Sequence, residues 1–269
     1  MELILGNREF IKVSHIARPI SEVFSCAPQA DSLEVSLTLR SRQFDSCPVI
    51  EGGVPVGVLV LSDCKSGVEA GEAMQAIGMR SIISADTGFI ETANRLLEDP
   101  FQFILEGSRL TGFVTAVDLG SPIGKSFIYL RVASVEMNFC KYLRSCFVDS
   151  ADALLLLSQT RQEILSEFIA RQKIDDEFID CFAACNLADL LQIAGKQEGF
   201  KESLRSFGSW TGLKRGLVAL RNDVMHPDRS LYTSGRDLGD LISRIHNLES
   251  IQNALEQSFE SSSISIDVE

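Results

Sequence analysis

One short segment of the chain combines an arginine, an asparagine and a histidine. Arg221 and Asn222 are adjacent, and His226 follows four residues later, directly before Pro227. Histidine titrates near neutrality and can take a proton from a 2′-hydroxyl or return it to a leaving group. The planar arginine guanidinium stabilises charge on phosphate oxygens, and Asn222 can orient either group. We therefore predict Arg221, Asn222 and His226 as catalytic residues for RNA cleavage without a metal.

The surroundings of this segment are locally basic. Residues 201–236 contain seven Lys or Arg against three Asp or Glu, and Trp210 within them could stack a base. Because a residue before proline disfavours the α conformation, we expect His226 at the end of a helix. The same residues have structural interpretations. Arg221 could pair with a neighbouring aspartate, His226 could interact favourably with the helix dipole, and Trp210 could lie in the core.

The first 120 residues contain an internal repeat. When residues 28–63 are shifted by 55 positions onto residues 83–118, seven of 36 positions are identical. Chance gives about two at ordinary composition. Each copy predicts a helix, an apolar strand, a glycine turn and a second strand that closes at Asp63 or Asp118. We expect the two copies to pack face to face, because neither can bury its sheet alone.

The C-terminal segment of the second copy resembles the motif of tandem cystathionine-β-synthase (CBS) domains. That motif is Gly, two apolar residues, Thr or Ser, two further residues and Asp, and the segment Gly112–Asp118 matches it throughout. The first copy has Gly57 and Asp63, but Val60 stands where the hydroxyl would be.

The CBS resemblance implies an adenine nucleotide (AMP, ADP or ATP) as a regulatory ligand. In the family the hydroxyl meets a phosphate or ribose, and the aspartate accepts hydrogen bonds from ribose hydroxyls. Carried over to this chain, the nucleotide-binding residues are Gly112, Thr115, Asp118 and Asp63. The alternative is that both copies are scaffolds without a ligand.

Beyond about residue 126 the apolar spacing changes from 2 to 3.6 residues, which predicts an all-α bundle of four or five helices. The expected helices cover residues 126–147, 153–174, 176–194, 213–225 and 235–259.

The Arg221–His226 segment resembles the signature of the HEPN superfamily, in which an arginine and a polar residue precede a histidine. Domains of that family are all-α, usually dimeric, and often metal-independent RNases or RNA-binding modules. Their first helix often carries an acidic residue shortly before a basic one, and Glu136 and Arg144 fit that description. The resemblance implies a homodimer in which two motifs face each other across a cleft.

The composition limits the classes of function. With 269 residues, 45% hydrophobic and 23% charged, the chain is expected to form about two globular domains. A net charge of -12 excludes a globally basic nucleic-acid binder, though not a local basic patch. No apolar run approaches the ~20 residues that span a membrane. Seven irregularly spaced cysteines favour reduced thiols, a cytoplasmic location and no metal site.

These patterns predict an α+β CBS pair over residues 1–120 and an all-α, HEPN-like helical bundle over residues 121–269. The first functional hypothesis is a nucleotide-regulated, metal-independent endoribonuclease of toxin or defence type, with no required cofactor. The alternative is a non-catalytic adenine-nucleotide sensor that binds RNA or a protein partner. A structural dimer module with neither activity is the third hypothesis.

Overall fold

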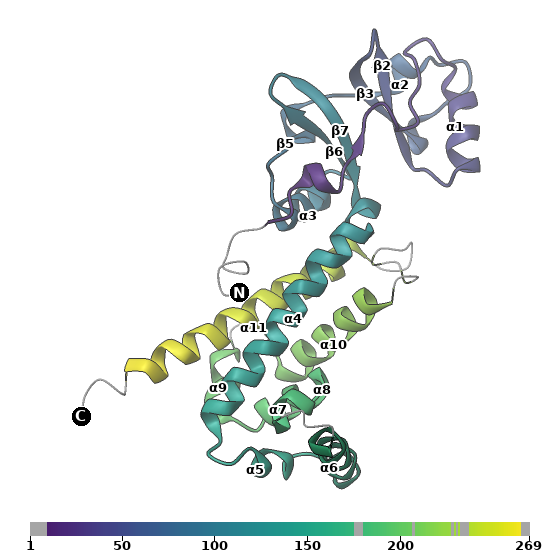
Figure 1. Cartoon of the computed structure of the whole chain (residues 1–269). Coiled ribbons are helices and arrows are strands. Elements are labelled where there is room, and N and C mark those ends of the chain that lie inside the picture. Colours follow the sequence, from purple (N-terminus) through teal and green to yellow (C-terminus); the bar gives the residue numbers. More distant parts are fainter. Residues whose placement is uncertain are drawn as a thin grey trace. The chain divides into compact units, whose positions relative to one another are not determined.

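The computed structural model of the chain divides into two compact units (Figure 1). The structure describes residues 10–174, 180–205, 208–226, 229, 231 and 237–264. The first unit ends at Gly124, and the second begins at Lys125. The first unit mixes strands and helices, whereas the regular elements described in the second are all helices.

The N-terminal unit contains two copies of one helix–strand–strand pattern. The first copy consists of α1 (Ser32–Ser41), β2 (Ser46–Glu51) and β3 (Val54–Val60), and the second of α3 (Phe89–Glu98), β6 (Phe101–Glu106) and β7 (Arg109–Thr115). The shorter helices and strands are β1 (Arg18–Pro19), α2 (Ala70–Ala73), β4 (Gln75–Ala76) and β5 (Ile82–Ser84). Four 3₁₀ turns accompany them: η1 (Val13–His15), η2 (Leu61–Asp63), η3 (Met79–Ser81) and η4 (Ala116–Gly120). The predicted repeat is confirmed.

Local sequence explains the two hairpins. Gly52 and Gly107 occupy equivalent turns with φ of 57° and 59°, a left-handed conformation that glycine adopts without steric cost. In the first copy, Asp31 begins α1 by accepting hydrogen bonds from the backbone N–H groups of Leu33 and Glu34.

Short strands connect the two copies reciprocally. The strand β1 precedes the first copy but pairs with β7 of the second, through Arg18–Phe113 and Pro19–Gly112. The strand β4 precedes the second copy but pairs with β3 of the first. Between the copies, Val58 of β3 shares a buried hydrophobic cluster with the rings of Phe101, Phe103 and Phe113. The two sheets therefore pack against each other, as expected.

The helical unit contains eight described helices (Figure 1). They are α4 (Pro122–Cys146, whose first three residues belong to the N-terminal unit), α5 (Ser150–Leu154), α6 (Gln159–Ile174), α7 (Cys181–Ala184), α8 (Leu187–Ala194), α9 (Glu198–Ser203), α10 (Trp210–Met225) and α11 (Leu238–Ile264). Buried apolar side chains of α4, α10 and α11 form much of the core, including Val135, Phe139, Leu217, Leu220, Leu248 and Leu255.

Two of the predicted helices are interrupted. The segment 153–174 divides into α5 and α6, and the segment 176–194 divides into α7 and α8. The second break has a clear cause. Cys185 is extended, and the Asn186 side chain caps α8 by accepting from the N–H of Asp189. Residues 176–179 and 235–236, at the starts of two predicted helices, lie outside the described residues. None of the described helices is long and apolar enough to cross a membrane.

Candidate functional site

The end of β7 holds a buried, oriented carboxylate. Oδ2 of Asp118 accepts hydrogen bonds from the Thr115 backbone N–H at 2.9 Å and from the Thr115 hydroxyl at 3.0 Å. Oδ1 accepts from Nε of Arg18 at 3.1 Å. The Asp118 side chain is only 8% exposed, whereas that of Arg18 is 60% exposed. The structure thus brings two predicted ligand-binding residues together and adds a cation that the sequence analysis missed.

Gly112 has a packing role at this site. A Cβ at Gly112 would lie 3.1 Å from Cγ1 of Ile104 and 3.3 Å from the carbonyl oxygen of Arg18. Glycine therefore allows β1 to lie close to β7, and the pairing of β1 with β7 holds Arg18 next to Asp118.

The equivalent aspartate of the first copy has a different environment. Asp63 is half-buried and accepts hydrogen bonds from the Ser62 hydroxyl at 3.1 Å and from Nε2 of Gln75 at 3.0 Å. Gln75 belongs to β4, which pairs with β3 just as β1 pairs with β7. Each aspartate therefore meets a side chain from the short strand beside it, but only Asp118 meets a charged one.

In the helical unit, Arg221 of α10 faces α4. Its NH1 atom donates to Oδ1 of Asn222 at 3.4 Å, and its Nε atom lies 3.9 Å from Oε1 of Glu136. Burial raises the pKa of the Glu136 carboxyl, and the positive charge of Arg221 opposes that rise. The neighbouring Asp223 is buried and is bonded by Arg244 of α11.

His226 follows the last residue of α10 with an exposed side chain. Its backbone carbonyl accepts a hydrogen bond from Nζ of Lys125 at 3.3 Å. The described hydrogen bonds thus join Arg221 to Asn222, while His226 is engaged through its backbone. Pro227 and Asp228 lie outside the described residues.

The described residues contain no group of three or more His, Cys, Asp or Glu that could hold a metal ion. All seven cysteines are free thiols. The sulfur atoms of Cys26 and Cys47 lie 3.9 Å apart.

Comparison with known proteins gives structural similarities only. No family model matches the chain, and no curated protein matches it. A structure of CBSX2 in complex with AMP is similar, with a TM-score of 0.36, 17% identity and coverage of 40% of this chain and 92% of that chain. The CBS domain of a bacterial CNNM/CorC family Mg²⁺ transporter in complex with ATP has a TM-score of 0.36, 18% identity and coverage of 41% and 85%. The CBS domains of a transcriptional regulator from Streptococcus pneumoniae have a TM-score of 0.35, 18% identity and coverage of 39% and 93%.

All three are CBS-domain structures, and each matches about two fifths of this chain. At these TM-scores and identities they do not assign the chain to a family. The HEPN-like character of the helical unit stays a prediction.

Proposed function

We propose that the N-terminal unit binds an adenine nucleotide at Asp118 and that this binding regulates an RNA-directed activity of the helical unit. The observation that carries the proposal is the pairing of a buried, oriented carboxylate with an exposed guanidinium at the end of β7. AMP and ATP, the ligands named for two of the similar structures, are the first compounds to test.

The chemistry follows from the donors and acceptors present. A carboxylate has about four lone-pair directions, and Asp118 uses three of them on Thr115 and Arg18. Since the Arg18 side chain is 60% exposed, its guanidinium can leave Asp118 provided that another donor takes its place on the buried carboxylate. A ribose hydroxyl would replace that bond, and the released guanidinium would then meet a phosphate.

The test is calorimetric titration of the chain with adenosine, AMP, ADP and ATP. We expect binding of at least one nucleotide. Asp118→Asn should weaken it by about 1.5–3 kcal/mol, the range for hydrogen bonds to a charged group. Thr115→Val should weaken adenosine and the three nucleotides alike, because the Thr115 hydroxyl donates to Asp118 and so orients the carboxylate that would meet the ribose.

The matched control is Asp63→Asn in the first copy, which removes the same charge at the equivalent position and should change the affinity much less. Absence of heat with all four compounds would refute the proposal. Equal weakening by both aspartate variants would place the ligand somewhere other than the second copy.

A second candidate function is metal-independent RNA cleavage by the helical unit as a homodimer. It is favoured by the contacts of the Arg221 guanidinium with Asn222 and Glu136, and by the exposed side chain of His226 five residues further along the chain. In the reaction, His226 would take the 2′-hydroxyl proton, and the 2′-oxygen would attack phosphorus to give a phosphorane that Arg221 stabilises. The P–O5′ bond would then break, and the protonated imidazole would return its proton to the departing 5′-oxygen.

Incubation of purified protein with RNA in EDTA, with and without nucleotide, tests this candidate. Cleavage should leave 2′,3′-cyclic phosphate ends, and a 2′-deoxy substrate should be inert. His226→Ala and Arg221→Ala should each lower the rate by about 10² or more. Equal cleavage by wild type and His226→Ala would identify a contaminant, and no cleavage under any condition would favour the non-catalytic sensor.

A further inference from the structure

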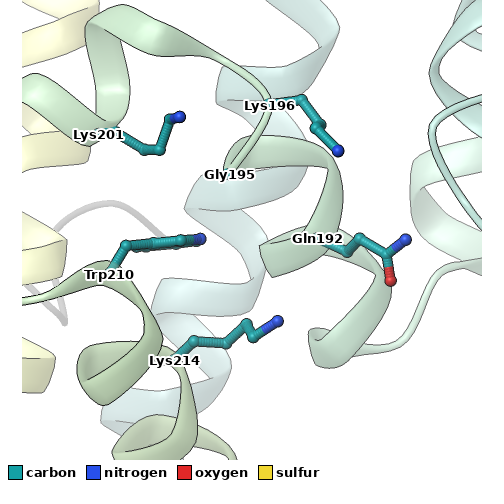
Figure 2. A pocket seen from close by; sticks show the side chains of 6 residues that line it. All are labelled: Gln192, Gly195, Lys196, Lys201, Trp210 and Lys214. Carbon is teal, nitrogen blue, oxygen red and sulfur yellow. The ribbon is translucent and has the colours of Figure 1, made fainter.

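A second feature of the helical unit is a pocket between α8, α9 and α10. Its volume is about 440 Å³, within the range of small-molecule sites. The lining residues are Gln192, Gly195, Lys196, Lys201, Trp210 and Lys214 (Figure 2). None of them belongs to the Asp118 or Arg221 groups described above. The three lysines come from three different segments, so the pocket gathers positive charge that is dispersed in the sequence.

The indole of Trp210 is a planar, half-buried surface in this pocket (Figure 2). Phe200, which is fully buried, supports it in an edge-on contact with ring centroids 5.7 Å apart and planes at 86°. The indole nitrogen edge lies against the end of α8, where a Cβ at Gly195 would be only 2.3 Å from Nε1. Among the described residues, no acceptor takes the indole N–H.

Two of the three lysines, Lys196 and Lys214, are not paired with carboxylates of the described residues. Asp189 of α8 is bonded by Arg161, and Glu202 of α9 pairs with Arg205 at 2.9 Å. Trp210 is also the first residue of α10, so the positive end of that helix dipole lies at the pocket.

We propose that this pocket binds a nucleotide unit, with its phosphate on the lysine ammonium groups and its base against the Trp210 indole. Three cations and a helix N-terminus favour a phosphate ester, and a supported indole favours a planar base, because base–aromatic stacking tolerates any base. The same nucleotide chemistry is presented by a free mononucleotide and by single-stranded RNA. The site is separate from the one proposed at Asp118.

Trp210 is the single tryptophan of the chain, so its fluorescence reports directly on the pocket. The experiment titrates the chain with AMP and, separately, with a 2′-O-methyl oligoadenylate about ten nucleotides long, which resists cleavage through its 2′-oxygen. We expect quenching of Trp210 emission by at least one probe, and competition by inorganic phosphate. Lys214→Gln should weaken binding about fivefold and reduce the salt dependence of the oligonucleotide affinity.

Arg215→Gln provides the matched control. Arg215 follows Lys214 on the same helix and is exposed, but it does not line the pocket. Its replacement removes the same charge. If the ligand contacts Lys214 directly, Arg215→Gln should change the affinity by less than about twofold, because it alters only the overall electrostatic potential. Asp118→Asn should leave the Trp210 titration unchanged, so failure of the nucleotide site at Asp118 would not affect this result.

Quenching by AMP alone supports the proposal with a free nucleotide as the source, and quenching by the oligonucleotide alone supports it with an RNA strand as the source. Absence of quenching by both probes would overturn it. Equal weakening by Lys214→Gln and Arg215→Gln would overturn it as well, because it would reduce the effect to net charge.

Discussion

Replacing Gly195 with alanine is expected to displace the only tryptophan and to destabilise the helical unit. Gly195 follows α8 with φ of -67° and ψ of -6°, a conformation that alanine adopts without strain. The added Cβ would lie 2.3 Å from Nε1 and 3.0 Å from Cε2 of Trp210, and 3.1 Å from the Leu191 carbonyl oxygen. Since the last of these atoms is helix backbone, the indole is the group that must move.

The size of the effect follows from two opposing contributions. Forcing extra atoms into a packed site costs about 1–3 kcal/mol. Alanine in place of a helical glycine returns roughly 0.5–1 kcal/mol. Trp210 is supported by the fully buried Phe200, so the ring cannot withdraw toward the core. We expect a net loss of about 1–2 kcal/mol.

Gly199→Ala is the matched control, because it makes the same substitution in the adjacent helix α9. A Cβ at Gly199 would meet no atom within 4 Å. This variant should therefore be as stable as wild type or more stable by about 0.5–1 kcal/mol.

The assay is urea unfolding followed by tryptophan emission, which reports on the helical unit alone because Trp210 is the only tryptophan. Gly195→Ala should lower the midpoint, shift the native emission to the red and increase quenching by acrylamide. If Gly195→Ala and Gly199→Ala have the same stability and the same native emission, the indole does not lie against the end of α8 and the reasoning about the pocket is wrong.

Three further predictions concern stability and assembly. Asp189→Ala should lower the free energy of unfolding in urea by about 2–4 kcal/mol. It leaves the part-buried Arg161 unpaired and removes the reciprocal cap with Asn186. A loss no larger than that of a typical surface substitution would contradict this prediction. Glu136→Gln should stabilise the fold at neutral pH, since burial raises the pKa of the carboxyl and disfavours its ionised form; this gain should vanish as the pH falls below the unfolded value near 4.3, where the carboxyl is protonated in both states. The chain should form a homodimer through the exposed apolar side chains of α4. Light scattering should therefore give twice the chain mass of 29.6 kDa. The double variant Leu130→Glu and Met137→Glu should give the mass of the monomer.

The repeat was predictable because its signals are local. Hairpin glycines, apolar alternation and the closing aspartates recur at a fixed separation, so both copies are visible without any tertiary information. The reciprocal strands β1 and β4 were not predictable. Each has two residues, which is too short for a periodic signal. Each is defined only by its pairing with a distant strand, β1 with β7 and β4 with β3.

Tertiary contacts between distant segments also explain why the sequence did not reveal some residues of the proposed sites. Arg18 reaches Asp118 from 100 positions away, through the strand β1. Glu136 was visible only as an acidic residue of the first helix in the HEPN resemblance, and the structure places it 3.9 Å from Arg221. The basic window around Trp210 included Lys201 and Lys214, but Lys196 precedes it and joins the pocket through the end of α8.

The reciprocal strands also give a physical reason to expect that the two copies differ as nucleotide sites. In the first copy, the carboxylate of Asp63 is bonded by the neutral amide of Gln75, so this pair carries a net negative charge and repels phosphate. In the second copy, Arg18 and Asp118 together carry no net charge, so an approaching phosphate meets no such repulsion and can draw the guanidinium to itself. Exchanging the two partners by Arg18→Gln and Gln75→Arg should therefore lower nucleotide affinity at the second copy. Binding should not appear at the first copy, because Val60 occupies the position equivalent to Thr115 and has no hydroxyl.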